Sequence, residues 1–169
     1  MLGVIAGVGV VVGAFVLLRP DPCGGTNFES ENFGYCIVVP EGWEAGPAQF
    51  GADVTLDQFA PPTGSATVVV EAVDLETGVG LDQWSEFVRQ RDESAGLTPG
   101  PASEARLDGA DALQWDVSVA AEGGDSFLMR EVVTVSGNVG WRVTLNDLQD
   151  GFDTSAVVFR DMLDSWQFA

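Results

Sequence analysis

The fold is decided by LQWDVSVAAEGGDSFLMREVVTVSGNVGWRVTL, Leu113–Leu145, which contains three strand-like runs separated by two turn sequences. Apolar and polar residues alternate in the first and last runs, the pattern of a strand with one buried face. EGGD at residues 122–125 and GN at residues 137–138 form the turns, and the middle run extends through Phe127–Val135. The segment therefore predicts three consecutive antiparallel strands. Its alternating apolar positions are Leu113, Trp115, Val117 and Val119 in the first run and Trp141, Val143 and Leu145 in the last.

Three further strands are predicted nearer the N-terminus. FGYCIVVPEGW, Phe33–Trp43, opens with a strand in which alternate residues from Tyr35 to Val39 point to one side, and a proline turn ends it. Asp53–Phe59 is a weaker strand, whereas Ser65–Asp74 is strong because it is rich in β-branched residues.

Two segments have helical rather than strand periodicity. LDQWSEFVRQRDESAG, residues 81–96, predicts a helix that ends at Gly96. A second helix closes the chain, and Asp153 or Thr154 is expected to cap its start. The apolar positions are Leu81, Trp84, Phe87 and Val88 in the first helix and Phe159, Met162, Leu163 and Trp166 in the second.

The order of these elements predicts an α+β fold. Three strands precede the first helix, and three or four strands, beginning at Ala105–Leu107, lie between the two helices. The economical arrangement is an antiparallel sheet of about six to seven strands with the helices packed on it.

The charge of the chain argues against several kinds of partner. Its 169 residues include 26 Asp and Glu but only seven Arg, with no Lys and no His, so the formal charge is -19. Nucleic-acid sites use Lys and Arg to neutralise phosphates, so we expect no nucleic-acid partner. Anionic lipid headgroups are disfavoured for the same reason. The acids are dispersed along the chain, which is typical of a solvated surface.

The residue types also argue against catalysis. Without histidine, the chain cannot form a Ser-His-Asp or Cys-His arrangement or a histidine metal site. Asp147, Asp150 and Asp153 lie in a loop that offers oxygen ligands for calcium, but their spacing misses the EF-hand pattern and a turn into a helix explains them better. Gly78 and Gly80 precede a helix without a phosphate-loop fingerprint. We expect no catalytic residues, cofactor or metal, and no enzymatic activity.

The N-terminal residues predict a membrane anchor. MLGVIAGVGVVVGAFVLL, residues 1–18, carries no charged side chain, and Leu2–Leu18 as a helix would span about 25 Å, enough to cross a bilayer. A cleaved signal peptide and a lipoprotein with lipidated Cys23 are alternatives, although the following RPDPC suits neither cleavage site. Residues 19–32 are expected to form a linker rich in Pro and Gly, and residues 33–169 the folded domain.

Four stretches together resemble the PsbP-like α/β/α sandwich, and most closely the bacterial envelope proteins of the LpqN/LpqT and DcrB type. They are FGYCIVVPEGW, LDQWSEFV, GWRVTL and FRDMLDSWQF, and the resemblance covers Phe33–Phe168. Its motifs are core and turn residues without a catalytic signature. The resemblance implies an extracytoplasmic accessory or binding role. We therefore expect the transmembrane helix predicted at residues 1–18 to hold the domain at the outer side of the cell membrane.

The two cysteines depart from that pattern. Cys36 stands where similar proteins often have a small polar residue, and RPDPC stands where many have a lipidation motif. In an oxidising compartment the simplest interpretation is a disulfide between Cys23 and Cys36. Two free structural thiols are the alternative, and a redox-active pair is less favoured because neither a C-x-x-C motif nor a neighbouring basic residue is present.

Two functions follow as hypotheses. In the first, a membrane-tethered envelope module presents its acidic surface to a protein partner with a basic surface. In the second, the domain carries a small molecule or lipid in an apolar cavity between sheet and helices. Trp43, just after the proline turn, is the tryptophan expected to line a surface groove. The other tryptophans occupy periodic positions and are predicted core residues: Trp84, Trp115, Trp141 and Trp166.

Overall fold

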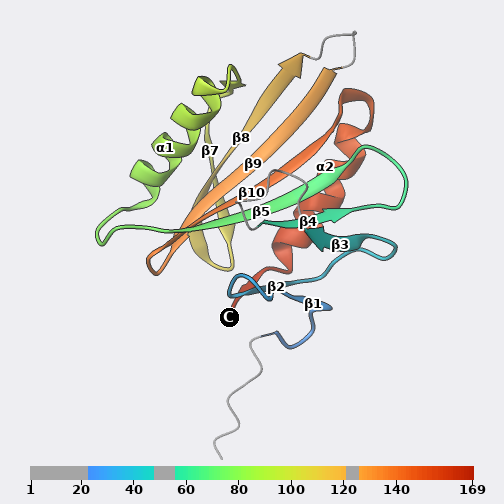
Figure 1. The fold of residues 1–169 in the computed structure, drawn as a ribbon, viewed down its shortest axis with the longest axis horizontal. Helices are drawn as coiled ribbons and strands as arrows, with labels where there is room; N and C mark the ends of the chain where they lie inside the picture. The colour runs from blue at the N-terminus through green and yellow to red at the C-terminus, as the bar shows by residue number, and fades with distance from the viewer. Residues whose placement is uncertain (1–22, 48–55, 121–125) are drawn as a thin grey trace, which may run out of the picture.

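The computed structural model describes residues 23–47, 56–120 and 126–169, which form two antiparallel sheets and two helices (Figure 1). The main sheet has eight strands in the order β3-β4-β5-β10-β9-β8-β6, and β7 also pairs with β8. The α+β fold with an antiparallel sheet is therefore confirmed, but this sheet has eight strands instead of the expected six to seven, because the short strands β3 and β6 extend its two edges. The strands of the main sheet are β3 Glu44–Pro47, β4 Asp57–Ala60, β5 Thr67–Asp74, β6 Thr98–Pro99, β7 Ser103–Leu107, β8 Ala110–Ala120, β9 Ser126–Ser136 and β10 Val139–Leu148.

The three predicted consecutive strands are the long strands β8, β9 and β10, which pair antiparallel in sequence order. The turn between β9 and β10 contains Gly137 with φ +61°, a left-handed conformation that glycine adopts without strain. Strand β5 pairs with the other edge of β10, so the strongest predicted strand lies beside the meander.

A second, three-stranded sheet was not expected from the sequence. It consists of β1 Phe28–Glu29, β2 Tyr35–Ile37 and β11 Gln167–Phe168, with β2 in the middle. The first predicted strand is thus separate from the main sheet, and part of the predicted linker, residues 19–32, pairs with it. The reason is the pairing of β2 with the C-terminal β11, a contact too distant in sequence for local patterns to show.

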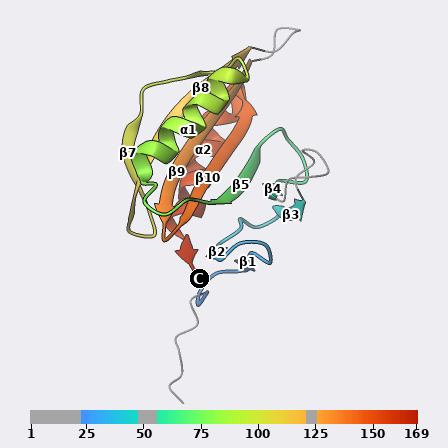
Figure 2. The ribbon, with the colours of Figure 1, turned by 60° about the vertical axis from the view of Figure 1, so that its left-hand side comes forward.

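The two helices cover opposite faces of the main sheet (Figures 1 and 2). Helix α1, Leu81–Ser94, packs on β8 and β9, and helix α2, Gln149–Asp164, packs on β9 and β10. Neighbouring side chains of a strand point to opposite faces, so Val132 joins the core on the α2 side and Val133 joins the core on the α1 side.

Helix α2 begins earlier than Asp153 or Thr154, the capping residues expected from the sequence. Its N-cap residue is Leu148, and the carboxylate of Asp147 accepts hydrogen bonds from the Leu148 N–H at 2.8 Å and the Ser155 hydroxyl at 2.5 Å. Asp147, just outside the helix, thus contacts both the N-cap and the second turn. The helix therefore starts before Asp153 and Thr154, and both residues lie inside it.

Helix α1 matches its predicted range closely and is followed by Gly96 with φ +81°. Its Trp84 ring lies against Gly140 of β10, where a Cβ atom would be 2.8 Å from the indole, and the indole N–H donates to the Trp141 carbonyl at 2.9 Å. In the described ranges no helix is long and apolar enough to cross a membrane. The predicted anchor, residues 1–18, lies outside them.

Candidate functional site

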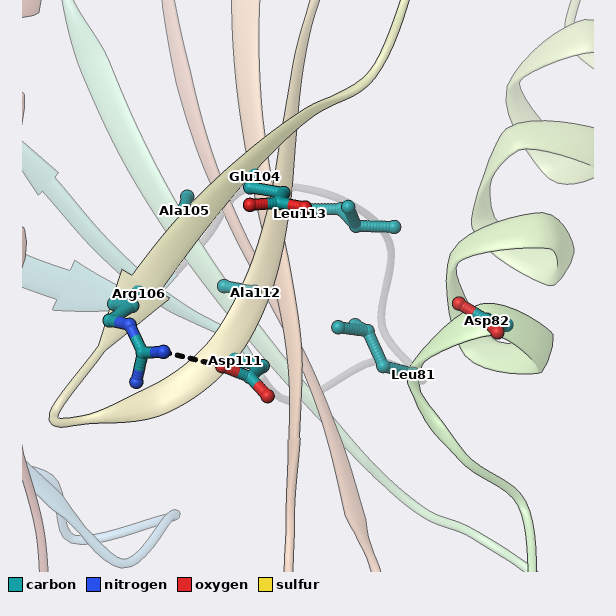
Figure 3. A pocket seen from close by; sticks show the side chains of 8 residues that line it. All are labelled: Leu81, Asp82, Glu104, Ala105, Arg106, Asp111, Ala112 and Leu113. Atoms are coloured by element: carbon teal, nitrogen blue, oxygen red, sulfur yellow. Dashed lines mark ion pairs between the residues drawn. The ribbon is translucent and has the colours of Figure 1, made fainter.

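A surface groove lies between the first turn of α1 and the β7–β8 hairpin, on the α1 side of the main sheet (Figure 3). We call it the hairpin groove. Its volume is about 520 Å³. The hairpin forms one wall and the start of α1 the other. Its lining residues are Leu81, Asp82, Glu104, Ala105, Arg106, Asp111, Ala112 and Leu113.

The hairpin turn and its register place polar side chains on the groove side. Both turn residues, Asp108 and Gly109, have positive φ, 46° and 76°, as in the two-residue turns that match the twist of paired strands. Glu104 pairs with Leu113, and Arg106 pairs with Asp111, across the two strands. Side chains of paired residues lie on the same face of a sheet, so these four face α1 together.

The groove combines an apolar floor with an acidic rim. Leu81 and Leu113 both pack against the α1-side core, and their remaining surface faces the groove. Asp82 and Glu104 are exposed, and neither side chain has a hydrogen bond or salt bridge to any residue that the structure describes. The groove can therefore attract a cationic group that also carries an apolar chain.

The one cation lining this groove is already paired. Arg106 lies 3.1 Å from Asp111 and also donates to the Gly109 carbonyl at 3.1 Å. Both side chains of the ion pair are well exposed, 71% and 81%, so the pair contributes little stability. Asp111 can exchange Arg106 for a cation from a partner at small cost.

A second polar feature, buried beneath the C-terminal end of α1, joins this helix to the sheet. We call it the arginine cluster, and it comprises Arg91 and Asp92 of α1, Glu71 of β5, Glu131 of β9 and Arg142 of β10. Arg91 donates two hydrogen bonds to Glu71, both 2.6 Å long. One Arg142 nitrogen, Nη2, donates to Asp92 at 2.8 Å and also to Glu131. Arg142 Nη1 also lies 3.8 Å from Glu71.

The carboxylates of the arginine cluster differ in acidity. Burial, opposed by Arg142 and assisted by the nearby Asp92 carboxylate, raises the pKa of Glu131 to about 7. Burial also acts on Glu71, but the hydrogen bonds and charge of Arg91, together with Arg142, hold the pKa of Glu71 below its ordinary value. Glu71 therefore stays ionised at neutral pH, whereas the protonated form of Glu131 is favoured as the pH falls below neutral.

A third polar group attaches the small sheet to the main one. The buried carboxylate of Asp57 accepts hydrogen bonds from the Ser30 hydroxyl at 2.5 Å, the Asn32 amide at 2.9 Å and the Tyr35 hydroxyl at 2.9 Å. Burial and the Asp57 charge raise the pKa of Tyr35, which keeps the phenol protonated. The Asp57 carboxylate accepts all three hydrogen bonds, so we interpret this group as a structural link between the two sheets.

The predicted disulfide is confirmed. Cys23 is bonded to Cys36, with their Cα atoms 5.5 Å apart, and Cys36 is fully buried in β2. The bond ties the start of the described chain to the small sheet. Trp43 is half-buried and packs against the α2-side core, and its place in a surface groove stays a prediction.

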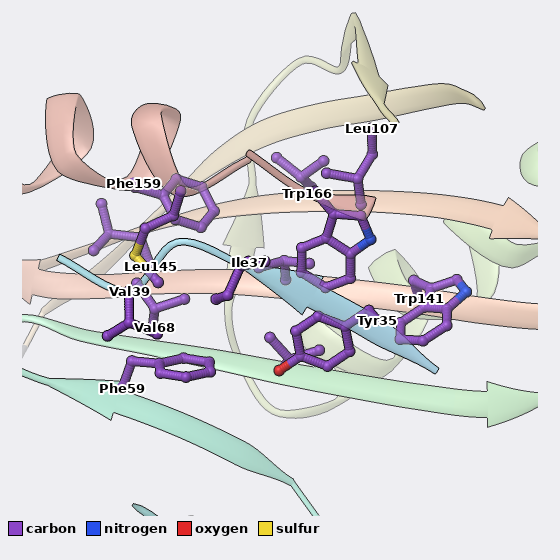
Figure 4. Close-up of a cluster of buried hydrophobic side chains, with 14 of the residues drawn as sticks. Tyr35, Ile37, Val39, Phe59, Val68, Leu107, Trp141, Leu145, Phe159 and Trp166 are labelled. Atoms are coloured by element: carbon purple, nitrogen blue, oxygen red, sulfur yellow. The ribbon is translucent and has the colours of Figure 1, made fainter. Parts of the chain in front are cut away.

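The four predicted core tryptophans are confirmed. Trp84 and Trp115 belong to the α1-side core, and Trp141 and Trp166 to the α2-side core. The Trp166 ring stacks on the Tyr35 ring with their centroids 4.2 Å apart. Trp141 lies beside this pair (Figure 4).

The three aspartates considered for calcium are divided between different roles. Asp147 is buried and fixes the start of α2, while Asp150 and Asp153 lie within that helix and are exposed. Within the described ranges no group of three or more Cys, Asp or Glu side chains is arranged to hold a metal ion.

Sequence reasoning missed the hairpin groove and the arginine cluster. The signal for the groove was SEARLDGADAL, residues 103–113, where a DG turn sets Glu104 and Arg106 on the same side. The signal for the cluster was a charged residue inside each of two apolar strands, Glu131 and Arg142. Neither pattern identifies the α1 residues that complete each site, which are Leu81 and Asp82 in the groove and Arg91 and Asp92 in the cluster.

The chain has a PsbP-like fold. No protein-family model matches it, and no curated protein sequence matches it. Its structure is similar to cyanobacterial PsbP (CyanoP) from Synechocystis sp. PCC 6803, with 16% identity, a TM-score of 0.61, and coverage of 87% of this chain and 97% of that one. It is also similar to LpqN of Mycobacterium tuberculosis, described as involved in cell envelope biogenesis, with 17% identity, a TM-score of 0.51, and coverage of 80% and 83%. A third similar structure is the Ran-binding protein Mog1p of Saccharomyces cerevisiae, with 11% identity, a TM-score of 0.58, and coverage of 83% and 93%.

Proposed function

We propose that this PsbP-like domain is a membrane-tethered accessory module of a cell envelope that binds a basic segment of a protein partner in the hairpin groove. The similarity to LpqN, which is involved in cell envelope biogenesis, and to the Ran-binding protein Mog1p supports an accessory or binding role over catalysis. The disulfide supports an oxidising compartment outside the cytoplasm.

The observation that carries the proposal is the pair of exposed carboxylates above an apolar floor. An arginine or lysine of the partner would lay its aliphatic stem on Leu81 and Leu113 and bring its charge to Asp82 and Glu104. Lysine and arginine side chains join an apolar stem to a cationic end, which is the combination that the groove complements.

The charge of the whole chain supports the same kind of partner. A formal charge of -19 attracts a basic segment from a distance and speeds its association. Salt screens such attraction over a Debye length of about 8 Å at physiological ionic strength, so binding should weaken as salt is added.

We place the domain at the outer face of the cell membrane, held by residues 1–18 as a single transmembrane helix. The disulfide at Cys23 would then fasten the polypeptide to the domain immediately after the short segment that leaves the membrane. We assign no catalytic activity to the domain. The carboxylates of the groove can attract a cation. Its lining has no histidine and no nucleophilic side chain paired with a general base.

The test is binding of a short synthetic peptide that alternates arginine with leucine, measured by fluorescence anisotropy with the full chain. The double variant D82N/E104Q should bind it roughly fivefold to tenfold more weakly, since each of the two exposed ion pairs should contribute about 0.5–0.7 kcal/mol. The matched control is E76Q/E93Q, which removes two exposed carboxylates outside the groove lining and reduces the net negative charge by the same amount. If both double variants weaken binding by the same factor, the net charge alone attracts the peptide and the groove is not its site.

A carrier function has one observation in its favour. A second groove, of about 430 Å³, lies between α2 and the strands β8 and β9. Its apolar lining includes Val157 and Leu163, with Arg160 at its exposed side, so an amphiphile with an acidic head would suit it. Extraction of the purified full chain with organic solvent, followed by mass spectrometry, would reveal a bound amphiphile.

A further inference from the structure

We propose that the arginine cluster is a proton-binding site, in which one proton shared by Glu131 and Asp92 fastens the C-terminal end of α1 to the main sheet. The proton site is a property of the helix–sheet interface and holds whatever the hairpin groove binds.

The first support is the balance of charge. The groups that face Glu131 are Arg142 from β10, Asp92 and Arg91 from α1, and Glu71 from β5. From β8, the residue opposite Glu131 is the uncharged Trp115. The Arg89 guanidinium of α1 lies over the Trp115 ring, 5.3 Å from its centroid, and donates to the Gly100 carbonyl instead of to a carboxylate of the cluster. Three carboxylates therefore meet two guanidinium groups, and one proton makes this buried group neutral.

The second support is a set of buried atoms without partners. Asp92 and Glu131 each give one oxygen to the same Arg142 nitrogen, so the two carboxylates are neighbours. Their other oxygens, Oδ2 and Oε2, are buried and have no hydrogen-bond partner within the described structure. A proton on one carboxyl group would let it donate to the other, which satisfies both oxygens at once. Buried polar atoms are almost always satisfied, so this arrangement removes two exceptions.

The third support is the cost of leaving the proton out. Glu131 is fully buried and the Asp92 residue is 3% exposed, so two ionised carboxylates would sit together away from water. Burial and the charge of the neighbouring Asp92 carboxylate both favour the protonated form of Glu131. The pKa of about 7 for Glu131 agrees with this geometry.

The consequence is that α1 is held more firmly below neutral pH than above it. A carboxyl group whose folded-state pKa is raised stabilises the folded arrangement at low pH, and this contribution is lost as the pH rises through the folded-state value. The chain has no histidine, and both cysteines are bonded to each other, so no other side chain ordinarily titrates near pH 7. Helix α1 also carries Leu81 and Asp82, so its attachment keeps the hairpin groove intact.

The experiment uses the full chain and two readouts. Carboxyl carbon NMR should show Glu131 titrating near pH 7, and hydrogen exchange should show α1 amides opening more often as the pH rises. After correction for intrinsic exchange rates, the opening equilibrium should increase by roughly 50-fold from about pH 5 to about pH 8. E131Q, which keeps the shape without the charge, should lose this dependence, and D92N should reduce it if E131Q fails to fold.

The matched control is E93Q, which removes an exposed carboxylate next to Asp92 on the same helix and should leave the pH dependence unchanged. A Glu131 carboxyl that titrates below about pH 5 would overturn the proton site. The proposal would also fail if E131Q retained the pH-dependent opening of α1. Both readouts are made without a peptide, so they remain decisive if the basic peptide does not bind.

Discussion

Replacing Arg142 by methionine tests how the arginine cluster stabilises the fold. Methionine keeps much of the length of the side chain but removes the donors that reach Asp92 and Glu131, whose side chains are 4% and 0% exposed. Glu71 keeps its two hydrogen bonds from Arg91, so its share of the loss is small. Two carboxylates are thus left buried without their cation.

The expected loss is about 3–5 kcal/mol in the free energy of unfolding, the usual result of removing one partner from a buried ion pair. This is a large part of the roughly 5–15 kcal/mol that stabilises a typical domain. The loss should be smaller at about pH 5 than at about pH 8, because a protonated Glu131 needs the cation less. E131Q combined with R142M should recover part of the loss for the same reason.

Urea unfolding, followed by tryptophan fluorescence, measures the change as a shift of the midpoint at constant slope. The control is R106M, which breaks the exposed pair with Asp111 and should cost less than about 1 kcal/mol. If R142M costs no more than R106M, or if its cost is equal at both pH values, the cluster does not act as described.

Two other predictions concern the backbone and the disulfide. Gly140→Ala should destabilise the domain by about 1–3 kcal/mol, because the new methyl group would lie 2.8 Å from the Trp84 ring. The control is Gly46→Ala, where the methyl group has open space and should cost little stability. Equal thermal midpoints for the two variants would contradict this packing. Replacing both Cys23 and Cys36 by serine should lower the free energy of unfolding by about 3 kcal/mol in the loop-entropy model, since the bond closes a loop across 13 positions. Intact mass before and after reduction should differ by two hydrogens in the wild type, and an unchanged mass would argue against the bond.

Several features of this protein follow from its sequence alone. The strands β8 and β10 follow from alternating apolar side chains, and α1 follows from apolar residues at helical spacing. The tryptophans of the core follow from the same periodicity. These features depend on neighbours within a few residues, so a local pattern contains the information needed to predict them.

The start of α2 shows where local patterns become insufficient. Asp153 and Thr154 are good capping residues, yet Asp147 fixes the start of the helix through contacts that also include the Ser65 hydroxyl, 82 positions earlier. The small sheet is a stronger case, because β2 pairs with residues at the far end of the chain.

The sequence by itself determined the acidic charge of the chain, the absence of histidine chemistry and the main strands and helices, and it favoured a bond between the two cysteines. Tertiary structure decided the hairpin groove, whose walls come from α1 and the β7–β8 hairpin, and the arginine cluster, in which Arg142 reaches Asp92 across 50 positions. The physical reason is that periodicity shows which side of an element is buried but does not identify the element packed against it. Sites built between elements depend on that choice, because distant side chains become neighbours only when the sheets and helices pack together.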